Sequence, residues 1–289
     1  MPRSTPHMFC FGLGYSAERL ARALAADGWA LAGTCRDEMR RDELRALGYD
    51  IHLFRGEEPL ADRSVLEGTT HLLSSVPPGT HGDPVLAHHA AEIAGLVGLE
   101  WVGYLSTTGV YGDRDGDWVD EDSALRPTGP RGERRLAAEA GWLELWRDHG
   151  LPVHLFRLAG IYGPGRNALE TVRRGRARRI VKPGQVFGRI HVDDIVATLC
   201  ASIARPNPGA AYNLADDEAA APQDVILHAC ELLGIEPPPE VPIEEAGLSD
   251  MAASFYRDNK RVRNRRIKEE LGVTLQWPDY RLGLKGLLE

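Results

Sequence analysis

Short hydrophobic runs alternate with helical patterns through the N-terminal part of the chain. Each run is four to six residues long, a length typical of buried strands. The runs occupy residues 8–11, 29–34, 51–54, 71–74, 101–105 and 153–158. Between the first two runs, Ala17, Leu20, Ala21 and Leu24 recur at the spacing of one helix face. Further helices are expected over residues 38–47, 83–97, 132–149, 195–203 and 223–233.

This alternation predicts a parallel sheet, because strands that are apolar on both faces need helices on both sides. Right-handed crossovers then wind the chain outward in two directions. We therefore expect an α/β fold, a doubly wound parallel Rossmann-type sheet with a small C-terminal substrate lobe. Residues 1–162 are expected to form the dinucleotide-binding Rossmann domain. Residues 163–289, where the pattern loosens, are expected to form a mixed substrate-side lobe with late sheet elements.

A glycine-rich turn follows the first predicted strand and opens the first predicted helix. Its first glycine permits a tight turn, its second lets the backbone approach a pyrophosphate, and its third position keeps a small side chain for packing. Amide groups at the helix start are suited to binding phosphates. An ordinary strand-to-helix turn with chance glycines is the alternative, but the surrounding pattern favours cofactor binding. The expected binding residues are Gly12, Gly14, Tyr15, Ser16 and Ala17.

The end of the second strand bears on the choice of cofactor. NAD-binding proteins usually carry an acid here for the ribose 2′-hydroxyl. This chain has Arg36 followed by Asp37, and a guanidinium is suited to a 2′-phosphate. Asp37 binding the ribose, with Arg36 a solvated loop residue, is the alternative. The pattern favours NADP, with NAD as the second choice.

Composition and charge narrow the classes of partner. The formal net charge of −8 argues against nucleic acid or an anionic membrane as the partner. The four cysteines are widely spaced, which argues against a metal site and a disulfide framework and favours a reducing compartment. No apolar run is long enough to span a bilayer, and residues 1–8 do not resemble a signal peptide. We therefore expect a cytoplasmic protein without a metal.

Three later motifs, taken with the glycine turn, carry a family resemblance. They are residues 106–112 (STTGVYG), 157–165 (RLAGIYGPG) and 189–195 (RIHVDDI). In this order the motifs resemble the extended short-chain dehydrogenase/reductases, which include nucleotide-sugar epimerases and dehydratases. The resemblance covers roughly the first three quarters of the chain. It implies a Rossmann fold and a nicotinamide cofactor, with Ser75 and Val76 near the nicotinamide side and Ser106 among the cofactor contacts.

The resemblance also locates the candidate catalytic positions. The family's catalytic Ser or Thr matches Thr107. Its Tyr-x-x-x-Lys pair, counted back from the segment Leu136–Glu139, falls on Arg131 and Arg135. Because an arginine is not deprotonated in a protein, Arg131 is not the family's acid/base. Arg135 keeps a hydrogen-bonding role toward the nicotinamide ribose. The chain is thus similar to a divergent branch of the family that lacks the Tyr-Lys pair.

Two questions stay open at this point. Tyr111 is either a substitute catalytic group near the nicotinamide or the packing tyrosine that this motif usually supplies, and Thr107 either contacts a substrate or closes a turn. Clusters of arginine at residues 173–179 and 261–266 are either solvated faces or a site for an anionic small molecule, such as a phosphate or a nucleotide diphosphate.

Two functions follow from these patterns. The first is an NAD(P)-dependent oxidoreductase or epimerase-like enzyme acting on a small, anionic carbonyl or sugar-derived substrate. The second is a non-catalytic NADP-binding regulatory or redox-sensing protein. The sequence is compatible with an oligomer in either case.

Overall fold

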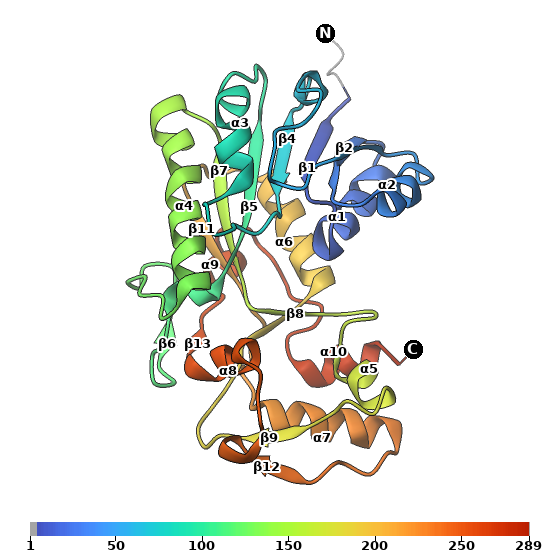
Figure 1. Cartoon of the computed structure of the whole chain (residues 1–289), viewed down its shortest axis with the longest axis vertical. Coiled ribbons are helices and arrows are strands. Elements are labelled where there is room, and N and C mark those ends of the chain that lie inside the picture. Colours follow the sequence, from blue (N-terminus) through green and yellow to red (C-terminus); the bar gives the residue numbers. More distant parts are fainter. Residues whose placement is uncertain (1–4, 289) are drawn as a thin grey trace. The chain divides into compact units, whose positions relative to one another are not determined.

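The computed structural model describes residues 5–288. Its centre is a sheet of seven strands in the order β11-β7-β5-β4-β1-β2-β3 (Figure 1). The strands are β1 (His7–Phe11), β2 (Ala30–Cys35), β3 (Asp50–Leu53), β4 (His71–Ser74), β5 (Trp101–Thr107), β7 (Val153–Leu158) and β11 (Ala211–Leu214). The pairs β1–β2, β1–β4, β2–β3 and β4–β5 are parallel. The predicted doubly wound α/β fold is confirmed.

Helices pack on the sheet because alternate strand residues point to opposite faces. The helices of this part are α1 (Tyr15–Ala26), α2 (Glu38–Arg45), α3 (Pro84–Ala94), α4 (Pro130–His149) and α6 (Val192–Ala204), with a 3-10 turn η1 (Ser64–Leu66). Phe9 and Phe11 of β1 share a core with Val85 of α3 and Trp142 of α4. Trp101 of β5 instead donates its indole N–H to Ser202 of α6, at 3.1 Å. The predicted apolar face of α1 is buried as expected.

The described chain divides into two compact units that are not continuous in sequence. The first comprises residues up to 106, residues 134–157 and residues 196–212. The second comprises residues 107–133, 158–195 and 213 onward. The sequence analysis placed one boundary after residue 162, and that division by function stays a prediction.

The second unit is built from short elements. It contains three two-stranded parallel sheets, β8 with β10, β9 with β12, and β6 with β13. Their bounds are β6 (Trp118–Val119), β8 (Gly160–Tyr162), β9 (Arg179–Val181), β10 (Arg189–His191), β12 (Glu240–Pro242) and β13 (Arg261–Val262). The helices are α5 (Ala168–Arg173), α7 (Pro222–Leu233), α8 (Asp250–Arg257), α9 (Arg265–Glu269) and α10 (Tyr280–Gly286), with 3-10 turns η2 (Thr108–Tyr111) and η3 (Ile243–Glu245). Leu169 of α5, Ala229 of α7 and Leu284 of α10 are central to a small separate core.

Within residues 5–288, no helix is long and apolar enough to cross a membrane. The same residues contain no group of three or more His, Cys, Asp or Glu side chains that would hold a metal ion.

Gly33 allows β2 to lie against the end of β1. It is paired in register with Cys10, and a Cβ added at Gly33 would lie 2.5 Å from the Cys10 carbonyl oxygen. The same Cβ would lie 2.8 Å from Leu13 of the glycine turn. A side chain at this position therefore forces the backbone of two neighbouring strands apart.

In the second unit, Asp216 lies two residues after β11 and its carboxyl group is buried. The residue is 3% exposed, and neither carboxyl oxygen has a hydrogen-bond partner among the described residues. Burial raises the pKa of Asp216 to about 8, although the positive charge of Arg189 opposes the shift. The folded protein therefore holds a proton here at pH values where an unfolded chain does not.

We expect Gly33→Ala to lower the free energy of unfolding by about 1–3 kcal/mol, because the added methyl group overpacks a site bounded by backbone. Denaturant unfolding of both proteins measures the change. Gly129→Ala is the matched control, since a Cβ there has no atom within 4 Å. Equal stability of Gly33→Ala and wild type would contradict the packing.

We expect Asp216→Asn to reduce the pH dependence of stability. The folded pKa is about 8 and the unfolded value is ~3.9, so wild-type stability falls as the pH rises between these values and levels off above pH 8. Asparagine does not ionise, so these values predict that the variant gains about 4 kcal/mol relative to wild type between pH 5 and pH 8.5. Thermal unfolding across this range measures the gain, and the exposed Asp148→Asn should show none. A difference that does not change with pH would refute the assignment.

Candidate functional site

The glycine turn in the first unit is held by the strands on both sides of β1. The Gly12 N–H donates to the Thr34 hydroxyl oxygen of β2 at 2.8 Å, and the Leu13 N–H donates to the Thr34 carbonyl at 2.7 Å. Gly12 has a φ of 82°, which favours glycine. The turn is therefore fixed in shape by contacts within the protein.

The space beside the turn is open where a dinucleotide phosphate needs it. A Cβ added at Gly14 would meet no atom within 4 Å. Gly14 is also the N-cap of α1, and no side chain caps this helix end. An uncapped helix N-terminus with an open approach is suited to an anion. Tyr15, Ser16 and Ala17, predicted to bind the cofactor, form the first turn of this helix.

The loop after β4 closes against the same turn. The Ser75 N–H donates to the Phe11 carbonyl at 2.9 Å, and the Ser75 hydroxyl donates to the Gly12 carbonyl. A Cβ at Gly12 would lie 3.0 Å from Ser75 Oγ and 3.1 Å from Val76 Cγ2. The structure thus brings predicted residues Ser75 and Val76 next to Gly12.

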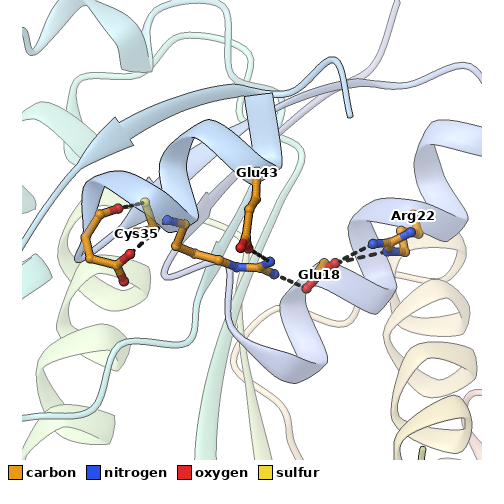
Figure 2. A network of polar contacts seen from close by, with 6 residues as sticks. Glu18, Arg22, Cys35 and Glu43 are labelled. Atoms are coloured by element: carbon orange, nitrogen blue, oxygen red, sulfur yellow. Dashed lines mark hydrogen bonds and ion pairs between the residues drawn. The ribbon is translucent and has the colours of Figure 1, made fainter. Parts of the chain in front are cut away.

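Figure 2 shows the polar network at the end of β2. The Asp37 carboxylate accepts the Arg40 N–H at 2.8 Å and so caps α2. The Arg40 guanidinium donates to Glu18 of α1 and to Glu43 of α2, the latter at 2.8 Å. Glu18 also accepts from Arg22 at 2.7 Å. These contacts engage the carboxylates of Asp37, Glu18 and Glu43.

Arg36 stands apart from this network. Its carbonyl oxygen accepts from Arg55 at 3.1 Å, whereas its exposed guanidinium has no hydrogen bond or ion pair with any residue that the structure describes. The basic group predicted to bind a 2′-phosphate is available, while the competing Asp37 carboxylate is engaged in helix capping.

Arg135 of α4 is tied to β5. Its guanidinium donates to the Leu105 carbonyl at 2.9 Å and to the Tyr104 hydroxyl at 3.0 Å, and it lies over the Tyr104 ring at 5.6 Å. Burial raises the pKa of Tyr104, and the positive charge of Arg135 opposes the shift. The Tyr104 hydroxyl is therefore neutral at ordinary pH.

A buried polar cluster lies one turn further along α4. Ser106 donates to Glu139 at 2.5 Å, and Arg157 of β7 pairs with Glu139 at 2.9 Å. Glu139 and Arg157 are 2% and 5% exposed. The predicted cofactor residue Ser106 thus has its hydroxyl in a structural contact that joins β5, α4 and β7. Sequence analysis missed Glu139 and Arg157 as partners, although a Glu in an otherwise apolar helix face is the signal that such a partner exists.

The candidate residues of the second unit separate into different roles. Thr107 accepts the Gly109 N–H at 3.1 Å and begins the η2 turn. Tyr111 is fully buried, and its hydroxyl donates to Asn213 at 2.7 Å. This arrangement supports the packing alternative for Tyr111. Arg131 opens α4 and lies over Phe255 of α8 at 5.6 Å.

Comparison with known proteins agrees with this construction. Residues 84–215 match the model of the NAD dependent epimerase/dehydratase family. A solved structure from Silicibacter pomeroyi DSS, of unknown function, is 53% identical, covers 98% of both chains and has a TM-score of 0.92. Protein YeeZ of Escherichia coli (strain K12) is 28% identical over 93% of this chain and 95% of its own.

More distant structures share the fold. The UDP-glucuronic acid 4-epimerase from Bacillus cereus, solved with UDP-glucuronic acid and NAD, is 16% identical, covers 96% of both chains and has a TM-score of 0.77. Residues 84–215 therefore carry the sequence pattern of the NAD dependent epimerase/dehydratase family, and the chain as a whole has the fold of these distant structures.

Proposed function

We propose that the protein binds NADP(H) in preference to NAD(H) and acts as an oxidoreductase or epimerase-like enzyme on a small, anionic, sugar-derived or carbonyl substrate. One observation carries the choice of cofactor: the Arg36 guanidinium has no partner among the described residues, while the Asp37 carboxylate caps α2. A free guanidinium attracts a 2′-phosphate, and a carboxylate used as a cap is not presented to a ribose hydroxyl.

The residues present fit a dinucleotide. Gly12 and Gly14 leave room for a pyrophosphate, and the uncapped start of α1 supplies a favourable dipole for its charge. When bound, the cofactor supplies a hydride donor or acceptor. Ser75 and Val76 are proposed to line its nicotinamide side and Ser106 to stay among its neighbours, although the Ser106 hydroxyl is committed to Glu139.

The chain's own residues offer fixed positive charge and a hydroxyl donor to a substrate in place of the acid/base pair that the resemblance implies. Neither Arg131 nor Arg135 gives up a proton at an accessible pH, so both act as fixed positive charges. Thr107 accepts one hydrogen bond and keeps its hydroxyl hydrogen for a substrate oxygen. We propose Thr107 and Arg131 as substrate-side groups and Arg135 as a group that holds its part of α4 on β5. Tyr111, buried against Asn213, is assigned no chemical step.

A non-catalytic NADP-binding regulator is the second candidate. The observation that favours it is the double replacement at positions 131 and 135, with Arg135 bound to the Leu105 carbonyl. The two candidates differ in turnover. An oxidoreductase oxidises NADPH when a carbonyl substrate is present, and an epimerase-like enzyme converts a UDP-sugar into its epimer with no net change in the cofactor. A regulator binds NADPH and converts neither substrate.

The partner and the cellular location of the protein are also part of the proposal. The B. cereus relative holds a UDP-sugar, so a small molecule of that chemical class is the proposed partner. We propose a cytoplasmic protein that uses neither nucleic acid nor a membrane as its partner, and an oligomeric form is compatible with this function.

We expect Arg36→Ala to weaken NADP binding roughly ten- to hundredfold, since a charge-assisted contact is worth about 1.5–3 kcal/mol. NAD affinity should change little, and added salt should reduce the NADP advantage because Arg36 is exposed. Calorimetric titration of both cofactors measures this. Arg41→Ala is the control, as Arg41 pairs with Asp42. Tighter wild-type binding of NAD, or equal losses for both cofactors, would show that Arg36 does not select NADP.

We expect Gly14→Val to abolish binding of both cofactors, because its side chain enters the space proposed for the pyrophosphate. Quenching or enhancement of NADPH fluorescence measures the loss. Stability should stay close to wild type, since the added atoms point into open space. Undiminished affinity in the folded variant would place the cofactor elsewhere.

A further inference from the structure

The start of α4 packs against the η2 turn within the second unit. A Cβ added at Gly132 would lie 2.8 Å from Pro127 and 3.0 Å from the Gly109 carbonyl oxygen. Gly132 therefore lets the helix approach the segment that begins with Thr107. Arg131, the residue before Gly132, lies in the first turn of the same helix.

The positive charge of Arg131 is not paired with an acidic side chain of the described residues. Its guanidinium lies 5.6 Å from the centre of the Phe255 ring, and it forms no hydrogen bond or ion pair within residues 5–288. Both residues are exposed, and the Phe255 side chain is 56% exposed although it is large and apolar. Stacking on a ring uses the face of a guanidinium, so its N–H groups remain available in the plane for a bidentate acceptor.

An acidic group that follows α8, the Asp258 carboxylate, is already paired. It accepts from the Thr128 hydroxyl and from Lys260, the latter at 3.3 Å. Lys260 also donates to the Gly112 carbonyl at 2.9 Å. These contacts join the segment before α4, the segment after η2 and the end of α8. They also engage the charge of Asp258, and Arg131 has no ion pair with any residue from 5 to 288.

We propose that Arg131 and Phe255 form a binding site for the oxyanion of a small-molecule substrate, a carboxylate or a phosphate ester. Arg131 then recognises substrate charge at the position where the family resemblance places a proton-transferring tyrosine. Phe255 holds the guanidinium in orientation and offers an apolar surface to the carbon skeleton beside the anion. This inference rests on the proposed function and names the chemical class of its substrate.

Calorimetric titration of the whole protein with three sugars tests the site. The probes are glucuronate, glucose 1-phosphate and uncharged glucose, with and without NADPH. We expect wild type to bind one or both anions at least tenfold more tightly than glucose. Preference for glucuronate indicates a carboxylate site, and preference for glucose 1-phosphate indicates a phosphate site. Arg131→Gln should lose the advantage of the anion, and Arg131→Lys should retain part of it because a point charge lacks the bidentate geometry.

Two further variants separate recognition from general charge. Phe255→Ala should weaken anion binding several-fold without removing it. Arg263→Gln is the matched control, because Arg263 lies over the exposed Trp118 ring at 4.9 Å in the same unit. It should bind the anions as wild type does. If Arg131→Gln and Arg263→Gln lost the same amount of anion affinity, the cause would be the overall charge of the protein and not the Arg131 site, and the proposal would be overturned.

The outcomes distinguish this inference from the function on which it rests. Wild type that binds NADPH but no anion, or Arg131→Gln that binds anions normally, overturns the Arg131 site and leaves the cofactor proposal standing. Wild type that binds anions but not NADPH overturns the proposed function instead. A melting temperature of Arg131→Gln close to that of wild type shows that the exposed substitution has not unfolded the protein.

Discussion

The first unit depends on one constraint: the turn after β1 has to be tight, rigid and open on its outer side. The turn is anchored inward by Thr34 of β2 and by Ser75 after β4, while the position of Gly14 faces open space. Three neighbouring parallel strands therefore end at one place. The carboxyl ends of parallel strands always share an edge of the sheet, and this is where such sheets bind ligands. Gly33 makes the arrangement possible, because any side chain there collides with the Cys10 carbonyl.

The pairing of arginines with acidic side chains determines which arginines remain available to bind an anionic ligand. At the end of β2, Glu18 and Glu43 neutralise Arg40, and Asp37 caps a helix, so Arg36 alone is left uncommitted in that network. In the second unit, Asp258 is engaged by Thr128 and Lys260 while Arg131 rests on an aromatic ring. An exposed ion pair contributes little to stability, but it changes which cations attract a ligand. The acidic partners therefore determine which basic groups can bind an anionic ligand, because an arginine that is paired with a carboxylate attracts such a ligand less.

The sheet and its glycine turn could be predicted from sequence because they are encoded by local patterns. Hydrophobic runs, helical spacing and the positions of Gly12 and Gly14 all lie within short windows of the chain. The short strands of the second unit could not be predicted, since pairs such as β9 with β12 join segments of two or three residues that are distant in sequence. The same holds for Glu139 with Arg157 and for Arg131 with Phe255, where each residue is ordinary until its partner is known. Sequence left two roles open for Tyr111, and its burial against Asn213 favours packing.

The buried cluster of Ser106, Glu139 and Arg157 joins α4 to two strands of the sheet. Glu139 lies one helical turn beyond Arg135 and joins α4 to β5 and β7 through contacts that do not involve residues 131 or 135. Removing one partner of such a buried pair is costly, because the other charge is left without compensation. This part of α4 is thus held by Glu139 together with Arg135, which donates to Tyr104 and Leu105 of β5. Arg131 takes no part in either set of contacts, because its guanidinium lies over the Phe255 ring, so the position of this part of α4 does not depend on the residue at 131.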